Sequence, residues 1–435
     1  MNVFKKVLSI FIILVVAISL AGCKEPAPLA DSGEGLFSDG LLAVEINDKW
    51  GYINTSGVVV IGFIYDEARA FFEERAVVKE GPHYFIIDAE GNKIFEDGYV
   101  FIERDKETGL FWFVKNDLLG LMNGDGGILA EPAFHIGKYT WIDQYVTYST
   151  YFSDGYARVT DGERYGFINT NGDLVLPIDY VSIGHFSKGL VVVSINQKKG
   201  YMNASGEVVI PANLEVANRF NENSHAIVAA TLETKLTYSV MNISGTVLFT
   251  GYDEIVHAGA YYIAKSANGY FLLTTTGQKV YPDGVNYMEV VNGYISLSEV
   301  NPNRITILEP SGRKLFELTE PDQNPSGALV DPTGHLYLYY RNGDGTFTID
   351  NGAKRYVLTG ESPIQIRGNF VVIRRNFKYG LFTLNGKEII GFQYDNLKMF
   401  QGGIFLYYEG TKFGLLDADG IKITDALYSN YENNK

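Results

Sequence analysis

The chain has 435 residues, of which 46% are hydrophobic and 14% aromatic, and its formal net charge at pH 7 is −15. This composition excludes a mainly disordered chain. The negative charge argues against nucleic acid as a partner and against direct adhesion of the folded part to anionic lipid. Cys23 is the only cysteine, so an internal disulfide, a CxxC pair and a thiolate metal cage are all excluded.

The first residues are typical of a targeting signal. Lys5 and Lys6 precede a 14-residue apolar run from Val7 to Leu20, which is too short to span a bilayer comfortably as a mature helix. We therefore predict a signal peptide over residues 1–22. The sequence Leu20-Ala21-Gly22-Cys23 resembles the lipobox of bacterial lipoproteins. That resemblance implies cleavage before Cys23 and a diacylglyceryl group on its thiol. The alternative is an ordinary signal peptide with a chance cysteine.

Lipidation would fix where the protein is found. Two acyl chains hold a protein stably at a membrane, whereas one does so only marginally. Residues 24–34 are Pro, Ala, Ser and Gly punctuated by charges, a composition typical of a tether. We therefore expect residues 23–35 to be the lipidated cysteine and a flexible linker. The folded part would lie on the extracytoplasmic side, at the cell surface or the periplasmic face, and would contact the membrane through the lipid anchor only.

The rest of the chain is organised by a repeat of about 34 residues. Each copy ends in a turn glycine, and successive glycines lie 32 to 46 residues apart. The eleven glycines are Gly57, Gly91, Gly126, Gly172, Gly206, Gly245, Gly277, Gly312, Gly352, Gly386 and Gly420. A period of this size is typical of solenoids, propellers and similar arrays.

A short motif precedes these turns and is clearest at Trp50-Gly51-Tyr52-Ile53-Asn54. Other copies start at Tyr165 and Tyr379, and the motif glycine recurs as Gly166, Gly200, Gly380 and Gly414. In two copies Phe85 and Phe271 replace that glycine. The aromatic position varies while the period is kept, so we interpret Trp50 as a buried plug between neighbouring sheets. Gly51 would give the adjacent strand room.

One unit is predicted to be a β-hairpin over residues 41–54, a third strand at 58–61 and an extended segment at 67–72. Asn54 to Gly57 form the turn, because Asn bonds its own backbone and Gly accepts positive φ. In other copies we expect the third strand to end at Pro177 or Pro211, since proline lacks the donor that continues a ladder. A sheet this small must stack on its neighbours.

The motif, the turn and the Tyr-Asp segment together resemble the bacterial WG-repeat family over about residues 36–425. The match is well preserved in residues 36–250 and degenerate in 251–435. The family implies a β-rich repeat with no reaction attached. We therefore predict an all-β, propeller-like array of about eleven short antiparallel units. One propeller, two propellers or an open β-solenoid or superhelix are the alternatives.

Recognisable catalytic and metal motifs are missing from the sequence. The six histidines occur singly, without a second histidine three to five residues away, and no GxSxG elbow, P-loop or GxGxxG run is present. The acidic runs at 123–126, 342–345 and 417–420 lack the carboxylate at position 12 of a calcium loop, so we interpret them as turns. We expect no enzyme, no cofactor and no metal. A glycoside hydrolase with a composite carboxylate site is the weakest alternative.

The repeat is broken between Gly126 and Gly172, where about twelve extra residues are rich in aromatics. The speculative binding residues there are Tyr139, Trp141, Tyr145, Tyr148 and Tyr151. An exposed aromatic loop suits carbohydrate or protein, whereas an extra edge strand packed on the array is the structural alternative. We therefore predict a non-catalytic binding or scaffolding module for another protein or a cell-envelope polymer. The second hypothesis is a carbohydrate-binding lipoprotein that uses residues 138–152.

Overall fold

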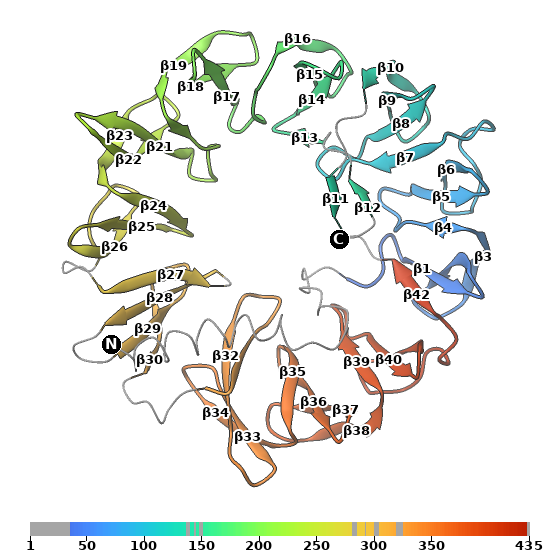
Figure 1. The fold of residues 1–435 in the computed structure, drawn as a ribbon. Coiled ribbons are helices and arrows are strands. Elements are labelled where there is room, and N and C mark those ends of the chain that lie inside the picture. Colours follow the sequence, from blue (N-terminus) through green and yellow to red (C-terminus); the bar gives the residue numbers. More distant parts are fainter. Residues whose placement is uncertain are drawn as a thin grey trace. The chain divides into compact units, whose positions relative to one another are not determined.

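The computed structural model describes residues 35–135, 140–142, 145–147, 151–280, 285–291, 293–299, 304–318 and 325–432. This part of the chain contains strands and turns and no helix. It forms eleven small antiparallel sheets of three or four strands and one two-stranded sheet (Figure 1). The all-β prediction and the predicted number of units are confirmed. Cys23 and the predicted signal and tether up to Glu34 lie outside the described residues.

The chain divides into two compact units, Glu73–Val285 and a second one made of both ends of the chain, Met1–Phe72 with Asn286–Lys435. In Glu73–Val285 each sheet is built from strands that are consecutive in sequence. The strand orders are β10-β9-β8-β7, β13-β14-β15-β16, β17-β18-β19, β20-β21-β22-β23 and β24-β25-β26. In addition, β5 pairs with β6 and β11 pairs with β12. The strands are β5 (Ala76–Glu80), β6 (His83–Ile87), β7 (Phe101–Arg104), β8 (Phe111–Lys115), β9 (Leu118–Met122), β10 (Ile128–His135), β11 (Thr140–Ile142), β12 (Tyr145–Thr147), β13 (Phe152–Ser153), β14 (Tyr156–Thr160), β15 (Tyr165–Asn169), β16 (Leu174–Tyr180), β17 (Leu190–Ile195), β18 (Lys198–Asn203), β19 (Val208–Leu214), β20 (Val216–Ala217), β21 (His225–Leu232), β22 (Lys235–Asn242), β23 (Val247–Tyr252), β24 (Glu254–Ala258), β25 (Tyr261–Ser266) and β26 (Gly269–Thr274).

The other unit joins the two ends of the chain in one sheet, ordered β3-β2-β1-β42, in which Val44 of β1 lies opposite Tyr431 of β42. Its strands are β1 (Leu41–Ile46), β2 (Lys49–Asn54), β3 (Val59–Tyr65), β4 (Glu67–Ala68), β27 (Tyr287–Val291), β28 (Tyr294–Glu299), β29 (Arg304–Leu308), β30 (Lys314–Leu318), β31 (Gly327–Val330), β32 (Leu336–Arg341), β33 (Thr346–Asp350), β34 (Arg355–Thr359), β35 (Ser362–Arg367), β36 (Phe370–Arg375), β37 (Lys378–Thr383), β38 (Glu388–Tyr394), β39 (Asn396–Met399), β40 (Phe405–Glu409), β41 (Lys412–Leu416) and β42 (Asn430–Glu432). Pairing of the first strand with the last is how a β-propeller closes, so the fold class is the propeller-like one.

The first sheet shows how the sequence builds a blade. The β1–β2 hairpin turns at Asn47 and Asp48, whose φ angles of 52° and 61° are the two positive values of a type I′ turn. The next turn is held by Asn54, whose Oδ1 accepts hydrogen bonds from the backbone N–H groups of Ser56 and Val58 at 3.0 Å each. Gly57 adopts a φ of 76° there. The predicted hairpin and turn are therefore confirmed.

The third strand is longer than predicted, because its pairing continues through a β-bulge. In the first sheet Tyr52 lies opposite Ile61 but Trp50 lies opposite Tyr65, so β3 runs on to Tyr65. The prediction that the third strand ends at Pro177 or Pro211 is wrong for the same reason. β16 and β19 continue past these prolines, which fall where the register shifts. A bulge leaves a residue out of the ladder, so proline is accepted there without a donor.

The bulge also explains the motif glycine. A Cβ atom on Gly51 would lie 2.7 Å from the carbonyl oxygen of Ile61 and 2.9 Å from that of Gly62. Gly166, Gly200, Gly380 and Gly414 meet a backbone oxygen of the next strand or segment at 2.5 to 2.8 Å in the same way. The predicted role of Gly51, to give the adjacent strand room, is confirmed.

Copies that replace this glycine with phenylalanine have no regular third strand among the described residues, and neither has the copy that keeps Gly414. After β6 and β26 the described residues make isolated bridges to the hairpin, such as Ile87 with Lys93 and Leu273 with Lys279. In both copies the lysine eight residues after the phenylalanine covers its ring, with Nζ 3.9 Å from the centroid of Phe85 and 4.0 Å from that of Phe271. An aromatic ring and a lysine therefore occupy the place of the missing strand.

The buried plug of the motif is not the residue that we predicted. Trp50 is only half-buried, and so are its counterparts Tyr165 and Tyr379. Tyr52, two residues later, has no exposed surface, and its hydroxyl donates to the carbonyl oxygen of Arg69 at 2.8 Å. Tyr201, which follows Gly200, repeats this bond to Asn218. Tyr407, on the strand before the Gly414 motif, makes the same kind of bond to Thr424. Trp50 and Tyr52 lie two residues apart and so on the same face of β2, but Trp50 lies beside the exposed β1–β2 turn, whereas Tyr52 lies in the middle of the strand.

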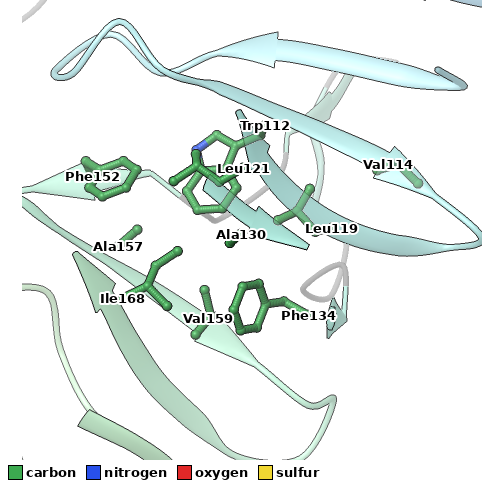
Figure 2. Close-up of a cluster of buried hydrophobic side chains, with 10 residues drawn as sticks. All are labelled: Trp112, Val114, Leu119, Leu121, Ala130, Phe134, Phe152, Ala157, Val159 and Ile168. Carbon is green, nitrogen blue, oxygen red and sulfur yellow. The ribbon is translucent and has the colours of Figure 1, made fainter. Parts of the chain in front are cut away.

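Neighbouring blades share their hydrophobic cores. Figure 2 shows one such cluster in the unit Glu73–Val285, where side chains of β8, β9 and β10 meet those of β13, β14 and β15. Its largest member, Trp112, stacks on Phe152 with 5.5 Å between ring centroids and 23° between planes. The blade therefore buries its faces against its neighbours, as expected for a repeat that cannot form a core alone.

A serine near the start of the inner strand links neighbouring blades at three places. The hydroxyl of Ser153 donates to the carbonyl oxygen of Phe186 at 2.9 Å, and the hydroxyl of Ser38 bonds that of Phe71. In the following blade the backbone N–H of Phe220 donates to the hydroxyl of Ser187 at 2.9 Å. The Phe-Ser pair of the sequence repeat is therefore a link between blades.

Candidate functional site

The predicted site residues fall in the aromatic insertion, which follows β10 in the unit Glu73–Val285. Its backbone forms a hairpin in which β11 pairs with β12, with Trp141 opposite Val146 and Ile142 opposite Tyr145. The sheet holds only these two strands in the part of the chain that the structure describes. Tyr139 and Tyr148 lie outside the described residues, and the side chains of residues 140–142 and 145–147 are not described either.

Tyr151 is the insertion residue whose side chain is described, and it marks the entry to β13. Its side chain is 42% exposed. Its ring stacks on the ring of His185, with 4.3 Å between centroids and 13° between planes. His185 comes from the segment between β16 and β17, in the next blade. Part of the Tyr151 side chain therefore remains open to solvent although its ring is stacked on His185.

Two arginines flank this stack. Arg158, on β14, donates through Nη1 to the carbonyl oxygen of Ile183 at 2.9 Å, and its guanidinium lies 4.7 Å from the ring centroid of Tyr165. Arg219, which follows β20, donates through Nη2 to the carbonyl oxygen of Phe186 at 2.9 Å and to the hydroxyl of Ser153. Side chains from three consecutive blades therefore meet around His185.

The imidazole of His185 is electrostatically unusual. Burial, together with the positive charges of Arg158 and Arg219, lowers the pKa of His185 to about 4. The ring is therefore neutral at pH 7. Its Nδ1 atom is buried and has no hydrogen-bond partner among the described residues. The site thus combines two guanidinium groups, one neutral imidazole and an exposed phenol.

The sequence contained a signal for this group that motif reading missed. Tyr151, His185 and Arg219 follow one another at intervals of 34 residues, and each stands directly before the phenylalanine that starts an inner segment. The same position holds Leu36, Ala70 and Met399 in other copies. Comparing one repeat position across the copies would have singled out these three polar or aromatic residues.

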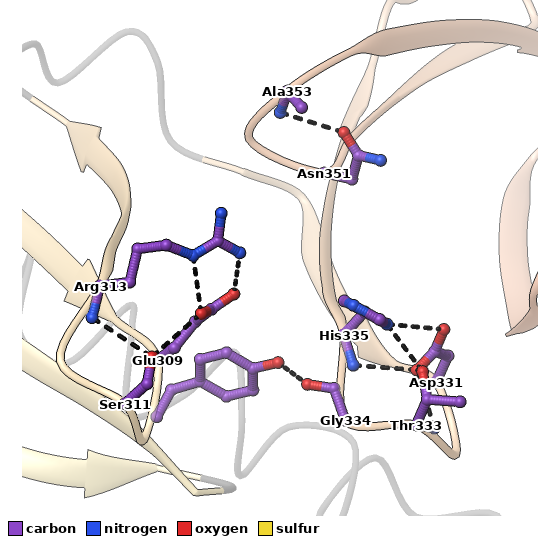
Figure 3. A network of polar contacts seen from close by, with 10 residues as sticks. Glu309, Ser311, Arg313, Asp331, Thr333, Gly334, His335, Asn351 and Ala353 are labelled. Carbon is purple, nitrogen blue, oxygen red and sulfur yellow. Dashed lines mark hydrogen bonds and ion pairs between the residues drawn. The ribbon is translucent and has the colours of Figure 1, made fainter.

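A second polar cluster, in the unit that holds both ends of the chain, is turn structure. Figure 3 shows Asp331 bonded within its own turn: its Oδ1 accepts from the backbone N–H groups of Thr333 and His335 at 2.9 Å each. Nearby, Glu309 accepts a 2.9 Å hydrogen bond from Arg313 Nε. Because these carboxylates are occupied by groups of their own turns, the cluster offers no open site.

The acidic runs that resemble calcium loops are also turns. Oδ1 of Asn123 accepts from the backbone of Asp125 and Gly127, and Oδ1 of Asp417 accepts from that of Asp419 and Ile421. Within the described ranges no group of three or more His, Cys, Asp and Glu side chains could hold a metal ion. Those ranges also hold no helix that is long and apolar enough to cross a membrane.

The fold and its regular blades define a repeat-built β-propeller. Four segments, residues 50–81, 165–198, 200–229 and 379–412, match the model of the family described as "WG containing repeat". The chain therefore contains WG repeats at these four places, and the resemblance seen in the motif is confirmed there. A comparison of the sequence with curated proteins finds no match.

Solved structures resemble the chain only distantly. One is a crystal structure of a eukaryotic initiation factor, which is 12% identical, with a TM-score of 0.40, 80% of this chain and 94% of that chain covered. Another is PorZ, a bacterial surface component of the type-IX secretion system of Porphyromonas gingivalis, with 10% identity, a TM-score of 0.21, and 93% and 68% covered. Scores this low carry no argument about what the chain does.

Proposed function

We propose that this chain is a lipid-anchored, extracytoplasmic WG-repeat propeller that binds another protein or a cell-envelope polymer without catalysing a reaction. The observation that carries the proposal is the break in the repeat. Regular blades with self-satisfied turns are interrupted after β10 by an aromatic hairpin, and the described end of that insertion, Tyr151, leaves an aromatic ring partly exposed. Exposed Tyr and Trp rings offer a large rigid contact area with a polar tip.

The anchor is the part of the proposal with the simplest test. Cys23→Ser is expected to move the protein from the membrane fraction to the soluble fraction, because the serine hydroxyl cannot receive the diacylglyceryl group and the apolar signal is too short to serve as a stable span. Fractionation of cells, with immunodetection of the protein, measures the change. Lys24→Ser, which keeps the thiol, is the matched control. A Cys23→Ser protein that stays in the membrane fraction would refute the lipoprotein assignment.

The binding role is tested by crosslinking on intact cells. The anchored wild-type protein should yield specific crosslinked species containing a protein or an envelope polymer, and these should be weaker for a variant that lacks the insertion aromatics. The control is the Cys23→Ser protein, which would be displaced from the membrane surface. No crosslinked species above the background of cells lacking the protein would contradict the proposal.

Carbohydrate is the second candidate for the ligand, and one observation favours it. Tyr151 is partly exposed and stacks nearly parallel on His185, and the guanidinium groups of Arg158 and Arg219 bond the backbone on either side of His185. A sugar ring presents an apolar face for such a stack and hydroxyl groups for such donors.

A further inference from the structure

One position of the repeat, which is apolar in other copies, holds an aromatic or polar residue in three consecutive blades. The residue before the inner phenylalanine is Leu36, Ala70 or Met399 in other copies, which suits a packed position. In the blades that follow the aromatic insertion it is Tyr151, His185 and Arg219. Packing between blades does not require a guanidinium or an imidazole at this position. The replacement of apolar residues by charged and polar ones therefore indicates a ligand.

The three side chains converge with a fourth, Arg158. Tyr151 and His185 are stacked at 4.3 Å. Arg219 reaches back across one blade to the carbonyl oxygen of Phe186, directly after His185, and Arg158 reaches forward to that of Ile183, two residues before it. Both guanidiniums are close enough to His185 to lower its pKa. The group is thus one cluster built on regular strands and their links.

Within the described residues, no carboxylate neutralises its positive charge. Neither Arg158 nor Arg219 forms an ion pair there, and their hydrogen bonds go to neutral oxygens. Other arginines of the chain are paired, as Arg75 is with Asp125, Arg313 with Glu309 and Arg355 with Asp350. In a chain of net charge −15, two arginines that both act on His185 and that have no carboxylate partner among the described residues favour an anionic ligand.

We propose that Tyr151, His185, Arg158 and Arg219 form a binding site for an anionic saccharide, an inference that rests on the proposed binding function and names its ligand class. The open face of Tyr151 would stack on a sugar ring. The guanidinium of Arg219 would bind the carboxylate or phosphate of that sugar through its remaining N–H groups, since its planar fork matches both anions. Arg158, held over Tyr165, would add charge, and His185 would support the Tyr151 ring.

The test uses the full-length chain in detergent and a defined probe, an oligosaccharide of galacturonic acid, with its methyl-esterified form as the neutral partner. Isothermal titration should show the acid form binding about tenfold or more tightly than the ester, because the ester removes a charge-assisted hydrogen bond. Arg219→Met and Tyr151→Ala should each weaken binding of the acid by about tenfold or more. Arg164→Met, in the same blade but paired with Asp179, is the matched control and should leave binding unchanged.

Each outcome has a definite consequence. Equal binding of acid and ester, or no change in Arg219→Met, would overturn the anionic part of the inference. Full binding by Tyr151→Ala would overturn the stacking role, and tight binding of inorganic phosphate alone would show a simple anion site. Arg219→Lys, which keeps the charge but not the fork, should bind with intermediate affinity. A thermal midpoint measured for every variant separates lost binding from lost folding.

Failure here is distinguishable from failure of the proposed function. If the acid oligosaccharide does not bind but crosslinked species persist on intact cells, the ligand class is wrong and the binding role stands. If the acid oligosaccharide does not bind and no crosslinked species form, both the ligand class and the binding role are wrong.

Discussion

Tyr52→Ala is expected to lower the free energy of unfolding by about 3 to 5 kcal/mol, the range found when a large buried aromatic is removed from a core. The side chain of Tyr52 has no exposed surface, contacts Phe71 edge-on with 4.8 Å between ring centroids, and bonds the carbonyl oxygen of Arg69. Its loss would therefore leave a cavity and a carbonyl group without a donor. Denaturant unfolding followed by circular dichroism measures the change.

Two neighbouring variants make this expectation specific. Tyr52→Phe keeps the ring and should cost only about 0.5 to 1.5 kcal/mol, the usual net value of one hydrogen bond. Trp50→Ala should cost about 1 to 2 kcal/mol, because that ring is half-buried. If Trp50→Ala proved as costly as Tyr52→Ala, Trp50 would be the plug after all and the burial pattern described above would be wrong.

Gly51→Ala is the second change with a large expected effect, a loss of about 1 to 3 kcal/mol typical of overpacking. The new methyl group would lie 2.7 Å from the carbonyl oxygen of Ile61. Backbone in a paired strand cannot yield as a flexible side chain would, so the bulge between β2 and β3 would have to open. The free energy of unfolding again provides the measurement.

Gly62 supplies a matched control on the opposite strand. A Cβ atom there meets nothing within 4 Å, and its φ is not in the left-handed region. Gly62→Ala should therefore change the free energy of unfolding by no more than about 0.5 kcal/mol, or stabilise slightly by restricting the unfolded chain. An equal loss from both glycines would mean that the close approach of β3 is not the reason for the motif glycine.

Much of the fold follows from local chemistry, which a single sequence displays. The Asn54 turn, the β1–β2 hairpin and the regular period could be predicted because each depends on residues close in the chain. The length of β3 and the continuation of β19 past Pro211 could not, since they depend on a bulge set by pairing with the preceding strand. The burial of Tyr52 rather than Trp50 likewise depends on how far along β2 the packing extends, since both side chains lie on the same face of that strand.

Only part of the candidate site could be predicted from the sequence. The aromatic insertion is conspicuous as an excess of residues with Tyr and Trp, and Tyr151 was singled out there. His185 and Arg219 lie in regular repeats, where a single histidine or arginine is normally interpreted as a surface residue. Their meeting with Tyr151 is a consequence of blade packing, which brings residues 34 positions apart into one row. Only the three-dimensional arrangement, or a comparison of repeat positions, reveals it.

The central claim is that the WG motif builds the fold while binding lies where the repeat is broken. The most direct measurement compares retention on purified cell-envelope polymer, together with the thermal midpoint, for wild type and for the double variant Trp141→Ala with Tyr145→Ala. We predict that the variant loses retention and keeps the thermal midpoint of the wild type. Retention equal to that of the wild type would contradict the claim. Loss of retention accompanied by a lower thermal midpoint would also contradict it, because the insertion would then be a structural element.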